Sequence, residues 1–468
     1  MDKKNCSKSK INVFQLAMIT VAYVASIRTS ALMAQYGLSS LSYYFLGAVL
    51  FLIPTALISA ELSTMFPSKG GIYTWVSKAV SGPYGFISIW IQFMSNLLCL
   101  PIFMIFLASS SAYIFGSLLA ENKYYVFVFI FAIVWLNTLM ALRGIRTSGR
   151  LTLLGNILGI LIPIAVLITF VFLWIISGNP INTPISVRAL FPNLSSIKNL
   201  VFLAGLILSF GGIETSGAHI LDMEQPRNYY KSILIATAII PTVSICSFAI
   251  SIIIPRGEIG IVTGVMEAFE AILKNFNLHF LVPLIAFIFV SGMAIMSNSG
   301  IIGPSKGLLG SSKGGELPPF FHKQNKNGVP VNLLMIQAIL ITAISSLVLF
   351  IPDINSAYLL ILDAATCIYM TMYIMMFVSV IILRYKYPNL PRPFKVPGGT
   401  IGIWIIAGIG TFSALTAIVL SFIPPSGVNI GDAIKYKFVT IICEAVLIGV
   451  GLLIYALRKP EWINQNVE

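Results

Sequence analysis

Long apolar runs alternate with short polar segments along the whole chain. Twelve of these runs are long enough to cross a hydrocarbon core, which takes about 20 apolar residues in a helix. They lie at about 11–35, 41–63, 84–118, 124–142, 152–177, 200–222, 231–255, 279–303, 332–351, 356–384, 401–423 and 436–457. The pattern predicts an all-α integral membrane protein of about twelve transmembrane helices, with the lipid bilayer as a partner and with no soluble domain.

Composition and charge support this prediction. The chain is 57% hydrophobic and 10% charged, whereas soluble domains carry about 25% charged residues. The net charge of +13 comes from basic residues in alternate loops, which is the positive-inside pattern and not the basic face of a nucleic-acid binder. The bias predicts that both termini are cytoplasmic, with a basic tail at 1–10 and a short tail at 458–468, and that the first apolar run is a retained span.

Two of the apolar runs are interrupted by polar residues and glycines. The first run contains Ser26-Ile27-Arg28-Thr29-Ser30, and the sixth contains the glycine-rich segment 211–217. Non-helical backbone at membrane depth is tolerated where it lines a cavity or is buried in protein. Breaks at matching positions of two repeats are typical of a transporter site, because half-helix N-termini can receive a carboxylate. The alternative is that the glycines only allow close helix packing.

Four ionisable residues lie well inside the runs: Arg28, Glu214, Asp363 and Glu444. Each costs about 2.5–3.5 kcal/mol at mid-membrane unless it has a partner or water. We hypothesise that Arg28 meets an acidic substrate or one of the acids, and that Glu214, with Asp363, serves proton coupling or gating. The alternative is a permanent ion pair. Glu444 is interpreted as a packing or subunit-contact residue, which leaves a homodimer open.

Other segments suggest structural roles. Glu61 lies near the cytoplasmic end of the second run, where simple exposure or a structural ion pair is expected. The segment 68–85 predicts a short interfacial helix, and 259–276 predicts an amphipathic external helix that is either a lid or a passive surface element. Tyr369 and Tyr373 are four residues apart and therefore share one helical face.

Neither an enzyme nor a cofactor site is predicted. An intramembrane enzyme needs a nucleophile with an oriented base or a metal cluster, and the five cysteines are scattered without the spacing of a metal site or a disulfide framework. A channel remains an alternative, in which the breaks would be pore constrictions.

Several strings resemble one transporter family. The segment ILSFGGIETSGAHILDMEQPRN at 207–228 resembles span six of the amino acid–polyamine–organocation (APC) superfamily. IIGPSKGLLG at 301–310, NKNGVPVN at 325–332 and GGIYTWVSKAVSGPYG at 70–85 resemble its bacterial glutamate/γ-aminobutyrate antiporter branch. The resemblance runs from the first span to the twelfth. Arg28 stands where the antiporters have an aromatic residue, and Met296 where they have an acid.

The resemblance implies a five-plus-five inverted repeat of the LeuT type, at 11–177 and 200–384, followed by two extra helices at 401–457. It also implies a multi-pass protein of the bacterial inner (plasma) membrane. Its function would be exchange of glutamate or a related amino acid for another amino acid or a decarboxylation product, by alternating access. A uniporter or proton symporter for neutral or cationic amino acids or polyamines is the alternative.

By the same resemblance, Glu214 is similar to the family's span-six acid, and Tyr369 and Tyr373 to its cavity tyrosines. Asp363 is added from its charge alone. The predicted substrate-binding set is Ser26, Ile27, Arg28, Thr29, Ser30, Gly211, Gly212, Ile213, Glu214, Asp363, Tyr369 and Tyr373.

Overall fold

The computed structural model describes the chain except residues 1–10, 25, 69, 144–153, 193–196, 312–314, 327, 424–432 and 463–468. The described part is built almost entirely of helices and has no named β-strand, only two isolated β-bridges. Within it, ten helices are long and apolar enough to span a membrane. The prediction of an all-α membrane protein is confirmed, while the count of twelve spans and the inverted repeat stay predictions.

The ten long helices follow the predicted apolar runs closely. Several of them contain a short 3-10 or π turn, so one span carries more than one label. They are α3–η1–α4 (Ser39–Gly47, Ala48–Leu52, Ile53–Met65), α6 (Gly82–Phe115), α7 (Lys123–Leu142), η3–α9 (Ile157–Leu161, Ile162–Ile176), η6–α12–η7–α13 (Pro226–Asn228, Tyr229–Ile239, Ile240–Val243, Ser244–Ile253), α15 (Val282–Ser311), α16–α17 (Val331–Ser345, Leu347–Phe350), α18 (Ile354–Lys386), α19 (Gly399–Ser421) and α20 (Ala433–Ala456).

The first and sixth runs form interrupted helices, as the sequence predicts. The first consists of α1 (Val13–Val24) and α2 (Arg28–Ala34), and the sixth of α11 (Val201–Ser209) and the 3-10 helix η5 (Ile213–Asp222). Neither run is one continuous helix of spanning length, so neither is among the ten. The two predicted spans that are missing from the ten candidate spans are therefore the two broken helices.

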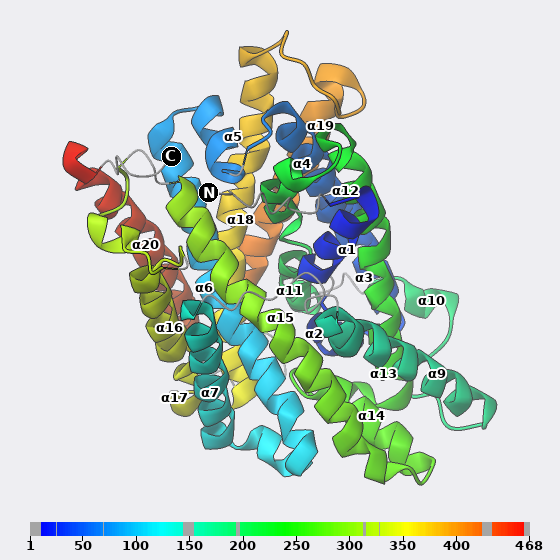
Figure 1. Cartoon of the computed structure of the whole chain (residues 1–468). Helices are drawn as coiled ribbons and strands as arrows, with labels where there is room; N and C mark the ends of the chain where they lie inside the picture. Colours follow the sequence, from blue (N-terminus) through cyan, green and yellow to red (C-terminus); the bar gives the residue numbers. More distant parts are fainter. Residues whose placement is uncertain are drawn as a thin grey trace, which may run out of the picture.

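The two broken helices lie side by side in opposite directions. α2 packs against α11, while α1 packs against η5, and these elements lie near the middle of the bundle (Figure 1). Further close pairs are α4 with α12, α6 with α15 and α7 with α16. These are pairs that a two-fold relation between the two predicted repeats would bring together. The arrangement places both backbone interruptions at one internal site.

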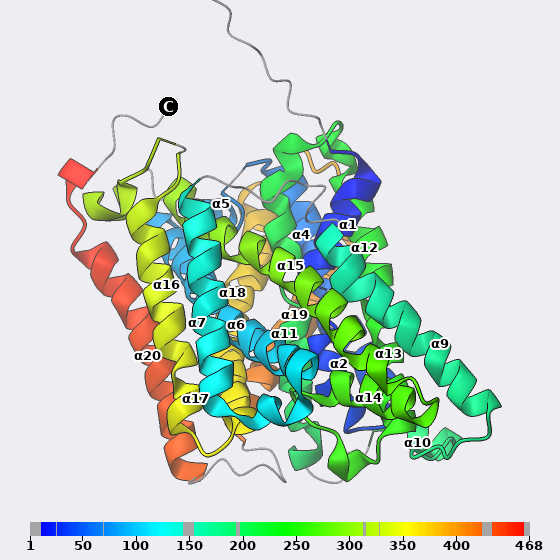
Figure 2. The same cartoon turned by 60° about the horizontal axis from the view of Figure 1, so that its bottom comes forward.

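The two ends of the bundle differ. The start of α1 and the end of α20 lie at one end, together with α5 (Ile72–Ala79), while α14 (Gly264–Asn275) and α17 lie at the other (Figures 1 and 2). We call these ends the terminal face and the distal face. Short helices thus occur in both segments where they are predicted. α14 buries its apolar side against α2, α9, α13 and α15; its role as a lid remains a hypothesis.

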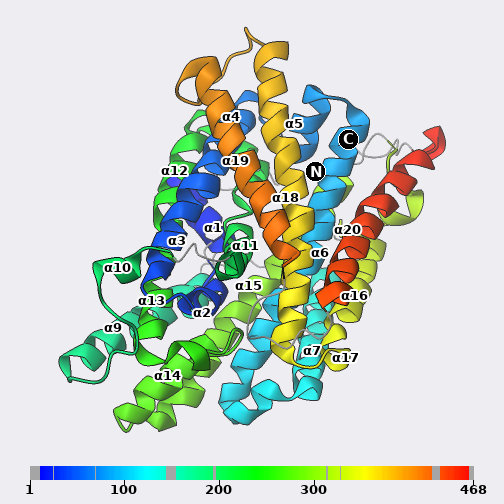
Figure 3. The same ribbon diagram turned by 180° about the vertical axis from the view of Figure 1, so that it is seen from behind.

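Large apolar side chains are exposed around the outside of the bundle. Phe131, Phe412 and Phe438 are 46%, 66% and 60% exposed, respectively. Water would not tolerate such a surface on a monomeric soluble protein, whereas lipid chains solvate it. Seen from behind, α18 is flanked by α19 and α20 (Figure 3), and it also packs against α6. α18 therefore has one side toward the core and another toward the two C-terminal helices.

Candidate functional site

A cavity of about 220 Å³ lies where the two broken helices meet. We call it the central cavity. It is bordered by both breaks and by α6, η3, α15 and α18. The described residues that line it are Val24, Ser26, Ile27, Arg28, Asn96, Cys99, Leu100, Phe103, Ile160, Leu208, Ser209, Gly211, Gly212, Thr215, Met293, Met296, Ser297 and Tyr369.

Arg28 gives this cavity its charge. It begins α2 directly after the break, and it is the one charged side chain among the lining residues just given. The residue is 9% exposed, and its Nε has no hydrogen-bond partner within the described part of the chain. No ion pair joins it to Glu214 or Asp363, all three being described. A guanidinium is always charged and pairs well with carboxylates, so the permanent ion pair considered above is not formed.

Glu214 lies behind the cavity wall, surrounded by hydrogen-bond donors. Its carboxylate accepts hydrogen bonds from the Tyr369 hydroxyl at 2.6 Å, the Gln92 amide at 3.1 Å and the Gly212 N–H at 3.2 Å, and also from the Tyr373 hydroxyl. The residue is 2% exposed. A buried carboxylate is costly unless it is paired or hydrogen-bonded, and these donors supply the compensation that water would give. Tyr369 lines the central cavity and Glu214 does not, so the tyrosine hydroxyl connects the carboxylate to a residue of the cavity wall.

The break in the sixth run depends on its two glycines. Gly212 has a φ of +112°, a conformation that residues with a Cβ rarely adopt. Its freed N–H donates to the Tyr373 hydroxyl at 2.7 Å. A Cβ at Gly211 would lie 3.0 Å from a ring carbon of Tyr369. The sequence therefore unwinds this helix where backbone and tyrosine rings approach each other closely.

The tyrosine pair occupies one face of α18, as the spacing predicts. The ring centroids of Tyr369 and Tyr373 are 4.9 Å apart, and both hydroxyls reach Glu214. The pair thus links α18 to η5. Only Tyr369 of the two borders the central cavity.

The structure corrects the expected position of Asp363. Its buried carboxylate accepts a hydrogen bond from Tyr436 of α20 and does not border the central cavity. The physical reason is helical phase: at 3.6 residues per turn, Asp363 lies about 120° around α18 from Tyr369. It therefore faces α20, while the tyrosine faces the core.

The remaining predicted residues divide into two groups. Six of the twelve line the central cavity: Ser26, Ile27, Arg28, Gly211, Gly212 and Tyr369. The others do not border it: Thr29 and Ser30 are buried within α2, Ile213 and Glu214 begin η5, and Asp363 and Tyr373 lie on α18.

Sequence reasoning missed the contribution of α6. Gln92 donates to Glu214, and Asn96 and Cys99 line the cavity. The side-chain amide of Asn96 also donates to the backbone carbonyl of Gln92 at 2.8 Å. The signal was present in the sequence, because Gln92 and Asn96 are two amides at i and i+4 in an otherwise apolar run.

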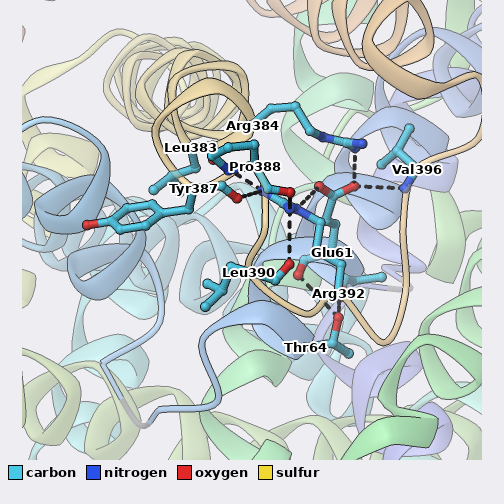
Figure 4. A network of polar contacts seen from close by, with 10 residues as sticks. Glu61, Thr64, Leu383, Arg384, Tyr387, Pro388, Leu390, Arg392 and Val396 are labelled. Carbon is cyan, nitrogen blue, oxygen red and sulfur yellow. Dashed lines mark hydrogen bonds and ion pairs between the residues drawn. The ribbon is translucent and has the colours of Figure 1, made fainter.

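Glu61 forms a structural ion cluster at the terminal face. Its carboxylate pairs with Arg384 at 2.6 Å and with Arg392 at 3.2 Å, and accepts the backbone N–H of Val396 at 2.7 Å (Figure 4). Arg392 also donates to backbone carbonyls near the end of α18, including that of Tyr387 at 2.9 Å. Of the two expected roles for Glu61, the structural ion pair is confirmed. The cluster ties α4 to the end of α18 and the loop that follows it.

Comparisons with known proteins agree with this architecture. The chain is 34% identical over 455 residues to an uncharacterized transporter of Legionella pneumophila, covering 96% of each chain. It is 30% identical over 459 residues to a glutamate/gamma-aminobutyrate antiporter of Lactococcus lactis, covering 97% of this chain and 91% of the relative. It is also 23% identical over 420 residues, 89% of each chain, to a probable agmatine/putrescine antiporter of Lactococcus lactis.

These relatives are transporters and not enzymes. The family model described as amino acid permease matches residues 11–444, from the first helix to the last. The match includes both broken helices, the central cavity and Glu214 with its tyrosines. The chain is therefore a multi-pass membrane transporter of small-molecule amino acid substrates, and it belongs to the amino acid permease family of the APC superfamily.

Proposed function

We propose that this chain is an antiporter that exchanges glutamate or a related amino acid for another amino acid or its decarboxylation product. The observation that carries the proposal is the unpaired guanidinium of Arg28 in a cavity without a lining carboxylate among the described residues. A positive, donor-rich site favours an anionic side chain over a cationic one. The glutamate/gamma-aminobutyrate antiporter among the relatives supports the same substrate class.

The size of the cavity restricts the substrate. Its volume of about 220 Å³ lies below the roughly 300–1,000 Å³ of pockets that take drug-sized ligands. In the proposed binding mode, Arg28 pairs with a substrate carboxylate. Ser26 and Asn96 contact its other polar groups, and Tyr369 packs against its carbon chain. Asp363 has no part in this contact set.

Glu214 is the proposed proton-coupling residue. It contacts the cavity through Tyr369, so a substrate that moves this ring also changes the hydrogen bonds of the carboxylate. Transport follows when the two repeats rock around the occupied cavity. In this proposal the terminal face, with both ends of the chain, is cytoplasmic, and the protein lies in a bacterial inner membrane.

Counterflow in proteoliposomes tests the proposal. The purified full chain is reconstituted with internal glutamate, and the twenty amino acids, agmatine and γ-aminobutyrate are offered outside in turn. We expect saturable exchange that requires a substrate on both sides. Uptake that proceeds equally without internal substrate would show a uniporter or symporter, and flux that never saturates would show a channel.

Arg28 variants test the substrate assignment. We expect Arg28→Ala to lower kcat/KM for glutamate by about 10–100-fold, because a hydrogen bond to a charged group contributes about 1.5–3 kcal/mol. Arg28→Lys should restore part of the loss, since it keeps the charge but not the bidentate geometry. In Arg28→Ala, kcat/KM for a neutral amino acid should fall less than kcat/KM for glutamate. Equal losses for both would contradict the assignment, provided that the melting temperature of the variant is unchanged.

A further inference from the structure

A second and larger chamber lies at the distal face. Its volume is about 760 Å³, which falls within the usual range of ligand sites. It is bordered by the loop before α14, by η2 (Ser117–Glu121) and by the starts of α7 and α18. Gln35, at the end of α2, and Phe202, in α11, also line it. The chamber therefore caps the distal halves of both broken helices. We call it the distal chamber.

The distal chamber and the central cavity lie along the same helix. Arg28 borders the cavity and Gln35 borders the chamber, seven residues or about 10 Å further along α2. Between them in sequence, Leu32 packs with Leu362 against Gly205, and all three are buried. Buried apolar side chains thus pack on the stretch of α2 between the two residues that border these compartments.

The two compartments have opposite charge. The chamber is lined by Glu121, Glu258, Glu267 and Asp353, against the single base Lys123. Four carboxylates and one ammonium give a formal charge of −3, whereas Arg28 makes the central cavity positive. A cleft lined by one sign of charge concentrates ligands of the other sign.

Two of the carboxylates already serve the local fold. Glu267 accepts the N–H of Gly260 at 2.8 Å, and Asp353 caps α18 by accepting the N–H of Ser356 at 2.8 Å. The base is also engaged, since the Lys123 ammonium donates to the carbonyl of Ile351 at 2.5 Å. These contacts hold the charged groups at the chamber wall but do not cancel the negative charge.

Three further side chains have no partner in the described part of the chain. Glu121 and Glu258 are exposed and form no side-chain hydrogen bond or ion pair there. Ser109 of α6 is fully buried, its hydroxyl has no partner, and it borders the chamber. A buried hydroxyl without a partner costs about 1–3 kcal/mol, and a ligand or water in the chamber would remove that cost.

We propose that the distal chamber binds the primary ammonium group of an organic amine, with Glu121 and Glu258 supplying the charge and Ser109 a hydroxyl acceptor. A metal ion is the poorer ligand, because the described residues contain no group of three or more His, Cys, Asp or Glu that could hold one. During amino acid exchange, the chamber holds the amine of a substrate that enters or leaves the central cavity. That role in exchange rests on the proposed function, but the binding itself does not.

Direct binding to the purified full chain tests this site without any transport. Labelled putrescine is titrated onto the protein in nanodiscs of neutral lipid. We expect the double variant Glu121→Gln/Glu258→Gln to raise the Kd about fivefold or more, since each exposed ion pair contributes modestly, and Ser109→Ala to raise it further. Glu270→Gln is the matched control, because Glu270 is an acid of the neighbouring α14 that does not line the chamber.

Four results would overturn the proposal. The first is a Kd unchanged in the double variant, and the second is an equal change in Glu270→Gln. The third is displacement of putrescine by Mg²⁺ at equal concentration, which would show a metal site. Arg28→Ala separates the two sites: it should lower kcat/KM for glutamate exchange by about 10–100-fold and leave the putrescine Kd within about twofold. Loss of putrescine binding in Arg28→Ala would place the amine in the central cavity and also overturn the chamber site.

Discussion

The Tyr369 hydroxyl donates a hydrogen bond to the Glu214 carboxylate over 2.6 Å, although the two residues are 155 positions apart in the sequence. This contact joins α18 to η5 directly behind the central cavity. The ring of Tyr369 borders the cavity while its hydroxyl reaches the acid. In the proposed binding mode, a substrate that packs against the ring acts on Glu214 without touching it.

Removing this hydroxyl should impair exchange more than it impairs folding. We expect Tyr369→Phe to lower the rate of glutamate exchange by about tenfold or more, because a hydrogen bond to a charged group is worth about 1.5–3 kcal/mol. The pH dependence of exchange should also change, since Glu214 loses one of its donors. Initial rates in proteoliposomes between pH 5 and 8 measure both effects. The control is Tyr385→Phe, on the same helix but exposed; a similar change there would contradict the prediction.

The broken helices were predictable because lipid makes backbone interruptions rare. Serines, an arginine and paired glycines in an apolar run leave few structural solutions, and both breaks occur where the sequence places them. The pairing of Tyr369 with Tyr373 was predictable from helical spacing. In each case the relevant information is local, within one or two turns of a helix.

Contacts between helices were harder to predict. A charge in a span indicates that a partner exists, but not on which neighbouring helix, and for Asp363 the partner is Tyr436. Gln92 reaches Glu214 across 122 positions, a contact that no local pattern contains. Helix rotation about its axis, which is set by packing with neighbours, decides these cases.

Gly212 should be intolerant of a side chain. Its φ of +112° lies outside the regions open to alanine, and such strain costs about 1–3 kcal/mol. We expect Gly212→Ala to lower the melting temperature and to reduce exchange, because relaxing the strain moves the N–H away from Tyr373. Gly408→Ala is the control, since a Cβ there meets no atom within 4 Å. A Gly212→Ala variant as stable and active as Gly408→Ala would show that the break does not need glycine.

The Glu61 cluster should stabilise the terminal face. Removing one partner of a buried ion pair costs about 3–5 kcal/mol, because the remaining charge is left uncompensated. We therefore expect Glu61→Gln to lower the melting temperature strongly, as two arginines keep their charge. The double variant Glu61→Leu/Arg384→Met should lose less stability than the sum of the losses in the two single variants. Glu224→Gln, an exposed acid, is the control, and a loss of similar size there would refute the prediction.

Tyr73 should make stability depend on alkaline pH. Burial, with the nearby Glu316 carboxylate, raises the pKa of Tyr73 to about 12, and its hydroxyl donates to Glu316 at 3.0 Å. The ordinary tyrosine pKa is about 10, so the folded state keeps a proton that the unfolded state loses between pH 10 and 12. This contribution to stability is full below pH 10 and is lost as the pH rises through about 12.

The variant Tyr73→Phe isolates that contribution. Melting temperatures between pH 8 and 12 should fall less steeply for Tyr73→Phe than for the parent chain, with the difference confined to pH above 10. Other buried tyrosines contribute equally to both proteins, so they cancel in the comparison. Tyr84→Phe, at an exposed position, should leave the slope unchanged. Parallel curves for Tyr73→Phe and the parent chain would be evidence against the hydrogen bond to Glu316.

Asp363 should matter for the attachment of α20 and not for the substrate. Its carboxylate accepts from the Tyr436 hydroxyl, whose other contact is the Leu359 carbonyl at 3.4 Å. Asp363→Asn keeps an acceptor oxygen, and we expect the free energy of unfolding to change by less than about 1 kcal/mol. Asp363→Ala leaves the Tyr436 hydroxyl with only the long contact to the Leu359 carbonyl, and loss of the nearer acceptor costs about 1–3 kcal/mol. Thermal unfolding of the two variants measures the difference.

The KM of the same variants distinguishes this role from substrate contact. Asp363 faces α20 and does not border the central cavity, so the KM for glutamate should stay within about twofold of the parent value in both. Glu444→Gln is a useful comparison, because Glu444 accepts from Thr371 at 3.0 Å across the same pair of helices. A large rise in KM for Asp363→Asn, with unchanged stability, would return Asp363 to the substrate path, because only a direct effect on the cavity alters affinity without loosening α20.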